Sequence, residues 1–194
     1  MSDRGPEIPR PPGVRPTKPP RRPAESIVMV NTGDGKGKST AAFGTMLRAG
    51  AEGWPVAVVQ FLKSGKWRVG EEAVARTLGV EWYAAGDGFT WDSTDLDESR
   101  AKAVAAWDFA RRLLDEGRHR LVILDEATYP MAWGWIATDE VTAALAARHP
   151  AVNVIVTGRD APPELVAAAD TVTEMTKVKH AFDSGVRARR GIDY

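Results

Sequence analysis

A short apolar run, IVMV at positions 27–30, leads directly into NTGDGKGKST at positions 31–40. Three glycines and two lysines crowd into that second stretch, and a helical pattern follows it. A strand, a glycine-rich turn and a helix together let backbone N–H groups converge on an anion, and the helix N-terminus adds partial positive charge. The stretch therefore predicts a phosphate-binding loop, with a plain surface turn as the alternative.

Particular side chains of this loop suit a bound nucleotide. We expect the Lys38 ammonium to reach phosphate oxygens and the Ser39 hydroxyl to ligate Mg²⁺. Lys36 and Thr40 supply further donors. The residue types thus match the chemistry of a triphosphate with its metal ion.

The loop departs from the strict pattern G-x-x-x-x-G-K-[ST] at one position. The first glycine of that pattern would stand at position 32, where this chain has Thr32. Gly33 and Gly35, on either side of Asp34, must therefore supply the flexibility of the turn. Gly37 stands where the pattern requires its second glycine.

Short β-branched runs alternate with helical patterns through the rest of the chain, which predicts an α/β fold. Strands covered on both faces lack polar alternation, as in parallel sheets flanked by helices. We expect a single, P-loop NTPase-like domain with a mostly parallel central sheet. The expected strands are 27–31, 56–61, 121–126 and 152–158, with 80–84 and 171–175 weaker, and the expected helices are 38–50, 70–79, 97–117, 138–148 and 162–169. In the third helix, Val104, Trp107, Ala110 and Leu114 form the expected apolar stripe.

Residues 1–25 differ in composition from residues 26–194, the expected globular domain. They hold most of the 13 prolines, several arginines and almost no apolar side chains. Such a segment cannot bury enough surface to offset its ordering entropy, so we expect a disordered tail. A basic arm that contacts RNA or a partner subunit is the alternative.

Charge and composition exclude several classes of protein. The formal net charge is +0, so no overall field attracts nucleic acid. The chain has no cysteine, which excludes disulfides and thiol nucleophiles. No apolar run approaches the ~20 residues that span a bilayer, and the N-terminus lacks the apolar segment of a secretory signal. We therefore expect a cytoplasmic protein that binds neither nucleic acid nor a membrane.

A second motif supports the nucleotide interpretation. The apolar run LVILDE ends in Asp125 and Glu126. In phosphate-loop NTPases, a strand with an acidic end holds Mg²⁺ or its water. Together with the loop, this motif predicts ATP or GTP bound with Mg²⁺.

The sequence carries no clear signature for hydrolysis of GTP or for phosphoryl transfer. The base-reading N-K-x-D of GTPases is absent, and no general base stands out. His119 and His149 lie at expected helix–strand junctions, where solvated histidines are usual, and His180 is as compatible with a hydrogen-bonded as with a functional histidine.

The aromatic residues indicate a large flat ligand. Phe89 and Trp91 stand in the glycine-flanked GDGFTWD, where they have no obvious core to join, so we expect them to contact such a ligand. Trp133 and Trp135 follow the acidic strand, and core packing or a dimer contact is an equal alternative for them.

The whole globular part resembles the phosphate-loop family of cob(I)alamin (corrinoid) adenosyltransferases. The resemblance covers about residues 25–194 and preserves the order of its motifs. It also accounts for Thr32, since the family's loop has threonine there. The motifs are TGDGKGKSTAAFG (32–44), VVQFLK (58–63), GFTWD (88–92), VILDEATY (122–129), VTGRDAPPELVAAADTVTEM (156–175) and VKHAFDSGVRARRGIDY (178–194).

The resemblance implies an activity. ATP, with Mg²⁺ or Mn²⁺, would give its 5′-deoxyadenosyl group to the Co(I) of a corrinoid and leave tripolyphosphate. It further implies a homodimer in cobalamin synthesis or salvage, an electron-donating reductase or flavoprotein as partner, and a downstream acceptor of adenosylcobalamin. Cob(I)alamin is itself a strong nucleophile, which agrees with the lack of a catalytic dyad.

The resemblance also implies roles for matching residues. Lys38 and Glu126 would be catalytic, and Ser39, Asp125 and Glu126 would hold the metal. Phe89 and Trp91 would face the lower side of the corrinoid, where excluding an axial ligand favours Co(I) over Co(II). The residues implied in binding ATP are Thr32, Gly33, Asp34, Gly35, Lys36, Gly37, Lys38, Ser39, Thr40 and Arg159.

The sequence departs from the family's pattern at two places, and two rival functions are alternatives to this interpretation. Asp34 replaces an asparagine common in the family, and Ser93 and Thr94 depart from its usual acidic-Thr-Gln-Asn. The rival enzyme is another phosphate-loop NTPase or a small-molecule kinase that cleaves at the γ-phosphate. The rival without catalysis is an ATP-gated corrinoid carrier.

Overall fold

A computed structural model describes residues 23–64, 70–86 and 96–193 as one α/β unit built on a six-stranded sheet. The strand order is β3-β2-β4-β5-β1-β6, and every neighbouring pair is parallel. This confirms the predicted fold class and all six predicted strands. The strands are β1 (Val28–Thr32), β2 (Val56–Ser64), β3 (Glu81–Gly86), β4 (Leu121–Asp125), β5 (Asn153–Thr157) and β6 (Thr171–Glu174).

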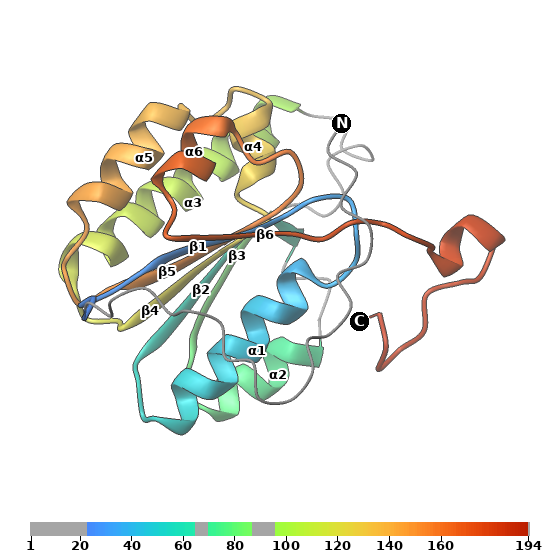
Figure 1. The fold of residues 1–194 in the computed structure, drawn as a ribbon, viewed down its shortest axis with the longest axis horizontal. Coiled ribbons are helices and arrows are strands. Elements are labelled where there is room, and N and C mark those ends of the chain that lie inside the picture. The colour runs from blue at the N-terminus through green and yellow to red at the C-terminus, as the bar shows by residue number, and fades with distance from the viewer. Residues whose placement is uncertain (1–22, 65–69, 87–95, 194) are drawn as a thin grey trace, which may run out of the picture.

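Helices cover both faces of the sheet, so the fold has three layers (Figure 1). One face carries α1 (Lys38–Ala51) and α2 (Gly70–Thr77). The other carries α3 (Leu96–Glu116), α4 (Thr128–Ala132), α5 (Thr138–Ala147) and α6 (Pro163–Ala168). All five predicted helices are confirmed.

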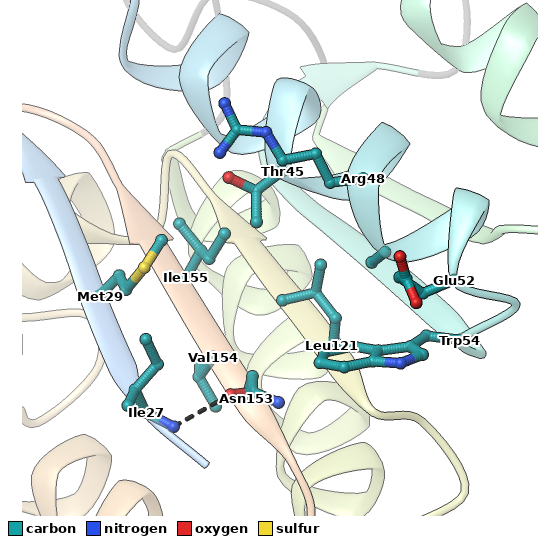
Figure 2. Close-up of a pocket in the computed structure, with 11 residues that line it drawn as sticks. Ile27, Met29, Thr45, Arg48, Glu52, Trp54, Leu121, Asn153, Val154 and Ile155 are labelled. Carbon is teal, nitrogen blue, oxygen red and sulfur yellow. Dashed lines mark hydrogen bonds between the residues drawn. The ribbon is translucent and has the colours of Figure 1, made fainter. Parts of the chain in front are cut away.

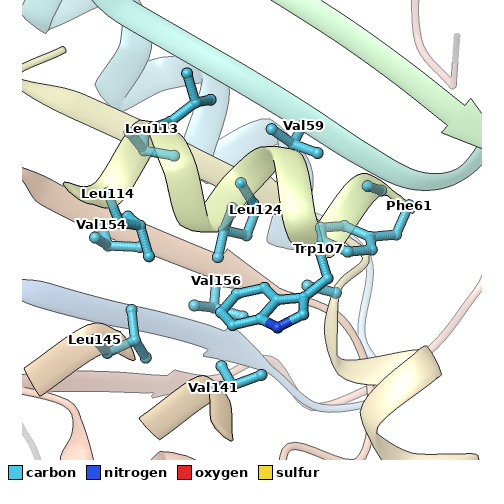
Figure 3. Packing of buried hydrophobic residues seen from close by; sticks show 14 of the residues in the cluster. Val59, Phe61, Trp107, Leu113, Leu114, Leu124, Val141, Leu145, Val154 and Val156 are labelled. Atoms are coloured by element: carbon cyan, nitrogen blue, oxygen red, sulfur yellow. The ribbon is translucent and has the colours of Figure 1, made fainter. Parts of the chain in front are cut away.

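The sheet has an apolar cluster on each face. Successive side chains of a strand point to opposite faces, so Val28 and Val30 join the cluster under α3 and α5, while Met29 packs toward α1. Figure 3 shows the first cluster, in which Trp107 of α3 lies between the sheet and α5. The Trp107 Nε1–H donates to Glu140 Oε1 at 2.8 Å, which satisfies its one polar group.

The predicted stripe on α3 is correct at three positions and wrong at Val104. Val104 is 37% exposed, whereas Ala103 and Ala106 are buried beside Trp107. Small alanines on this face let the helix approach the sheet closely, and the larger valine lies at its flank. Hydrophobicity alone therefore misplaced one residue of the stripe.

Within the described residues, two short helices were not predicted, namely α4 and a 3₁₀ turn at Ala181–Ser184. Helix α4 has only five residues and includes Pro130. Proline is tolerated in a first helical turn because the N–H groups there have no intrahelical partner. Because proline usually interrupts a helix, the sequence did not predict α4.

Some predictions fall on other parts of the chain. Most of the predicted tail (1–25) and the pair Phe89 and Trp91 lie outside the described residues. Among the helices that are described, none combines the length and hydropathy needed to cross a membrane.

Candidate nucleotide-binding site

The loop between β1 and α1 has a conformation that requires glycine. Gly33 and Gly37 have φ of 94° and 115°, in the left-handed region that favours glycine. A Cβ on Gly33 or on Gly35 would lie 2.6 Å from the carbonyl oxygen of Met175. Steric contact as well as backbone conformation therefore selects glycine here.

The loop is held against the segment that follows β6. The Gly35 N–H donates to the Met175 carbonyl at 2.6 Å, and the Met175 N–H donates to the Thr32 carbonyl at 2.8 Å. The Thr32 hydroxyl accepts from the Ala161 N–H at 3.2 Å. Thr32 thus ties the loop to the turn after β5, which a glycine at this position could not do.

Lys38 closes the loop from inside. Its Nζ donates to the carbonyls of Gly33 at 2.6 Å and Gly35 at 2.7 Å. The Asn31 Nδ2 donates to the Lys38 carbonyl at 3.2 Å, which fixes the start of α1. In the described part of the chain no side chain caps this helix at Gly37, so the N–H groups of its first turn, where Ser39 lies, suit an anion.

The end of β4 carries a buried carboxylate. Asp125 is 0% exposed and accepts from Gln60 Nε2 at 2.9 Å and from the Thr157 hydroxyl at 2.7 Å. The Gln60 Oε1 in turn accepts from the Trp82 Nε1–H at 3.1 Å. Hydrogen bonds satisfy this chain of buried polar groups across β3, β2, β4 and β5.

Glu126, the next residue, has a strained backbone. Its φ of 63° lies in the left-handed region, which a residue with a Cβ rarely adopts. The Glu126 N–H donates to the Thr157 Oγ1 at 2.9 Å. Strain of this kind clusters at functional sites.

Charges from three loops meet at Lys38. Burial lowers the pKa of Lys38 below its ordinary value, and the Arg159 guanidinium lowers it further. The carboxylates of Asp34, Glu126 and Asp160 oppose that shift. The Lys38 ammonium therefore interacts electrostatically with groups of the loop itself, of the end of β4 and of the end of β5.

The turn that carries Arg159 is anchored by α4. The Thr128 hydroxyl donates to the Arg159 carbonyl at 2.5 Å. Gly158 has φ of 141°, and a Cβ there would lie 2.0 Å from the Thr128 Oγ1. The Arg159 Nε lies 4.0 Å from Asp34 Oδ1 across the loop.

The structure brings the described predicted residues to one edge of the sheet. Thr32–Thr40, Asp125, Glu126 and Arg159 all lie at or just after the carboxyl ends of β1, β4 or β5. Lys36 points another way, since its ammonium pairs with the carboxylate of Asp193 near the C-terminus. Ligands of open α/β sheets bind at this edge.

Sequence analysis missed several residues that shape the site, among them Gln60, Thr157 and Met175. A polar residue within or just after an apolar strand is a signal for Gln60 and Thr157. Met175 acts through its backbone, for which a sequence gives no signal.

The site's oxygen ligands are compatible with Mg²⁺. Ser39 offers a hydroxyl and Glu126 a carboxylate, the hard oxygen ligands that Mg²⁺ prefers alongside water and phosphate. Within the described ranges no three His, Cys, Asp or Glu residues group as a metal site. A metal held jointly with substrate phosphates, which needs only one or two protein ligands, fits these residues.

The aromatic residues of α4 and the turn after it are not core. Trp133 is 38% exposed, and its ring lies 5.7 Å from that of Tyr129 and 4.8 Å from that of Trp135. Burial raises the pKa of Tyr129, the Arg159 guanidinium opposes that shift, and the Glu126 carboxylate adds to it. The aromatic row thus begins beside the candidate site, reaches the surface at Trp133 and ends at the half-buried Trp135.

The histidines have structural surroundings. His119 is buried rather than solvated, and its Nε2 lies 3.0 Å from Glu81 Oε2, because the preceding turn folds it against β3. His149 is exposed, as predicted. The His180 Nδ1 accepts from the Phe182 N–H at 3.1 Å and caps the 3₁₀ turn.

An apolar hollow of about 250 Å³ lies at the opposite edge of the sheet (Figure 2). Its lining includes Ile27, Leu121 and Asn153, at or before the first residues of β1, β4 and β5. The end of α1 closes it with Arg48 and Ala49. This hollow is therefore remote from the phosphate loop.

Comparison with known proteins identifies the family. Residues 24–194 match the family model described as ATP:corrinoid adenosyltransferase BtuR/CobO/CobP. The chain belongs to this family. It is 45% identical over 168 residues to the corrinoid adenosyltransferase CobA of Salmonella typhimurium, covering 87% of this chain and 85% of that protein. It is 43% identical over 175 residues to the corrinoid adenosyltransferase of Pseudomonas aeruginosa, covering 89% and 86%.

The similarity of the chain to solved structures is low. The cytoplasmic domain of EssC matches with a TM-score of 0.48 and 12% identity, over 85% of this chain and 34% of that one. The assignment rests on the family match, which confirms the predicted resemblance and the predicted enzyme class, a corrinoid adenosyltransferase.

Proposed function

We propose that this enzyme transfers the 5′-deoxyadenosyl group of ATP to the Co(I) centre of a corrinoid and releases tripolyphosphate. The single observation that carries the proposal is the meeting of the phosphate loop, Glu126 and Arg159 at one sheet edge in a member of this family. The cobalt electron pair attacks C5′ and forms the Co–C bond. The C5′–O bond breaks, and its electron pair leaves with the triphosphate.

The chain's part in this reaction is to hold the departing triphosphate and orient C5′. The N–H groups of the loop and first turn of α1 bind the phosphates, and the Lys38 ammonium turns from the loop carbonyls to phosphate oxygens. Arg159 lies near enough to Lys38 to add a second cation. Such fixed charges act most strongly where charge develops in the transition state.

The proposed divalent ion is Mg²⁺, with Mn²⁺ as a substitute. When bound, the ion neutralises charge on the triphosphate. Ser39 and Glu126 are its proposed ligands. Asp125, predicted as a ligand, is proposed to contribute from the buried network beneath them.

The proposed corrinoid contacts are Phe89 and Trp91, assigned from the sequence. By filling the space below the ring, they would exclude an axial ligand and make Co(II) easier to reduce. The electron would come from a reductase or flavoprotein partner, and the product would pass to a downstream acceptor.

The proposed assembly is a homodimer in the cytoplasm. The C-terminal segment exposes large apolar side chains, with Val178 93% and Phe182 77% accessible in the single chain. Apolar exposure of this kind is typical of an interaction surface.

An anaerobic assay tests the proposed reaction. The wild-type protein is incubated with ATP, Mg²⁺ and chemically reduced cobalamin, and Co–C bond formation is followed by absorbance. We expect adenosylcobalamin to accumulate with wild-type protein and not with Lys38→Ala. Absence of the bond with wild-type protein that binds ATP would contradict the proposal.

A further inference from the structure

Thr157 links the two acidic residues at the end of β4, through the carboxylate of Asp125 and the backbone amide of Glu126. Its hydroxyl donates to Asp125 Oδ1 at 2.7 Å and accepts from the Glu126 N–H at 2.9 Å. Thr157 is fully buried, so water does not compete for these bonds. One hydroxyl therefore uses its donor on one acidic residue and an acceptor site on the next.

The sheet register builds this arrangement. Gln60 of β2 is the register partner of Asp125, and Val156 of β5 is the register partner of Leu124. The parallel register therefore places Gln60 of β2 on one side of Asp125 and Thr157, the residue after Val156, on the other. Gln60 fixes Asp125 Oδ2, and Thr157 fixes Oδ1.

The bond to Glu126 falls where the backbone is strained. Glu126 has φ of 63°, and Thr157 Oγ1 holds the amide of that same residue. Without this bond, the turn could relax toward a common backbone conformation, and the Glu126 side chain would leave its place. That place is within electrostatic reach of Lys38 in the phosphate loop.

We infer that Thr157 is a positioning residue that aims Glu126 at the metal–triphosphate complex. The inference rests on the proposed function, since it takes Glu126 as the metal-facing carboxylate. Thr157 is fully buried, and its hydroxyl is engaged by Asp125 and by the amide of Glu126. It acts through the backbone of Glu126 and the buried carboxylate of Asp125.

The test is equilibrium binding of ATP, by calorimetry, in excess Mg²⁺ and again in a chelator. Thr157→Val removes the hydroxyl at nearly constant volume. We expect it to weaken binding of Mg²⁺–ATP by about tenfold, the loss typical when a group that orients a metal ligand is removed. Binding of metal-free ATP should stay near the wild-type level, because the phosphate loop is untouched.

Two variants serve as controls. Thr157→Ser keeps the hydroxyl, and we expect it to bind Mg²⁺–ATP like wild type. Thr173→Val makes the same change at an exposed position of β6 and should have no effect. If Thr157→Val does not fold, Thr157→Ala takes its place. Alanine lacks both the hydroxyl and the γ-methyl of threonine, and ATP binding with and without Mg²⁺ is compared in the same way.

The spectrum of bound Mn²⁺ gives a second readout. The electron paramagnetic resonance spectrum of Mn²⁺–ATP should differ between wild type and Thr157→Val, and should be restored in Thr157→Ser. A purely structural threonine would lower the melting temperature and weaken both forms of ATP equally. That result, or unchanged Mg²⁺–ATP affinity in a folded variant, would overturn the inference.

Failure of the inference and failure of the proposed function are distinguishable. Metal-dependent ATP binding that is normal in Thr157→Val overturns the inference alone. Absence of a Co–C bond, with the expected loss of metal-dependent binding in that variant, overturns the proposed reaction alone.

Discussion

Asp34 places a carboxylate in a loop that we propose binds a triphosphate. Its side chain is exposed and its Oδ1 lies 4.0 Å from the Arg159 Nε, so the repulsion of phosphate is partly offset. We expect Asp34→Asn to strengthen ATP binding by no more than about fivefold, because exposed charge pairs contribute roughly 0.2–1 kcal/mol. Calorimetry at two ionic strengths would show a smaller effect at high salt. Weaker binding in Asp34→Asn would mean that the pair orients Arg159.

Lys38 should give ATP affinity a distinctive alkaline pH dependence. Burial, and next Arg159, lower the pKa of Lys38 below 10.5. Only the protonated form attracts triphosphate, so affinity is full below the lowered pKa and falls as pH rises through it. We expect Lys38→Ala to bind ATP about 10- to 100-fold more weakly near neutral pH and to lack the alkaline fall. If ATP affinity falls with rising pH in the same way in both proteins, the fall comes from a group other than Lys38.

The lowered pKa of Lys38 also makes the stability of the fold depend on pH. Because its pKa is lowered in the folded state, the unfolded chain holds the proton more tightly, and protonation at low pH opposes folding. This contribution disappears as pH rises toward 10.5, so the melting temperature of wild type relative to Lys38→Ala should increase over that range in thermal unfolding.

Single residues of the site differed in how well sequence could predict them. Asp125 and Glu126 were predictable because carboxylates follow an apolar strand. Gln60 and Thr157 stand out in the sequence only as polar residues of apolar strands, and their partners depend on the register that aligns β2, β4 and β5. A register is a tertiary property that no local pattern encodes.

At the scale of elements, the phosphate loop should tolerate no side chain at Gly35. A Cβ there would lie 2.6 Å from the Met175 carbonyl oxygen and 2.9 Å from the Thr176 carbonyl carbon, both backbone atoms that cannot move cheaply. We expect Gly35→Ala to displace the loop from β6, to weaken ATP binding at least about tenfold, and to lower the melting temperature.

Gly44 provides a matched control within the adjacent helix. A Cβ at Gly44 of α1 meets no atom of the described residues within 4 Å, so Gly44→Ala should raise stability by about 0.5–1 kcal/mol through helix propensity. Thermal unfolding of both variants checks the pair. Equal stability changes at the two glycines would contradict the role of the Met175 contact.

The regular elements were predictable because burial of their faces leaves a recognisable pattern of apolar residues in the sequence. Continuous apolar runs predicted the buried strands, including β4, whose five residues are all buried. The error at Val104 arose because alanines, rather than the larger valine, form the close contact of α3. The short helix α4 was not predicted, because proline usually ends a helix and Pro130 lies inside this one.

At the scale of the whole molecule, the exposed C-terminal segment predicts association. We expect sedimentation to show a dimer, and Phe182→Ser to shift it toward monomer. Leu78→Ser, which changes another exposed apolar residue, is the control. A wild-type monomer at micromolar concentrations would contradict the dimer.

The fate of the triphosphate tests the central claim most directly. In an anaerobic reaction with ATP, Mg²⁺ and reduced cobalamin, ³¹P NMR identifies the phosphate product while absorbance follows the Co–C bond. Adenosyl transfer predicts intact tripolyphosphate that appears in step with adenosylcobalamin, and neither product with Lys38→Ala. Orthophosphate and ADP without a Co–C bond would instead show cleavage at the γ-phosphate and contradict the account.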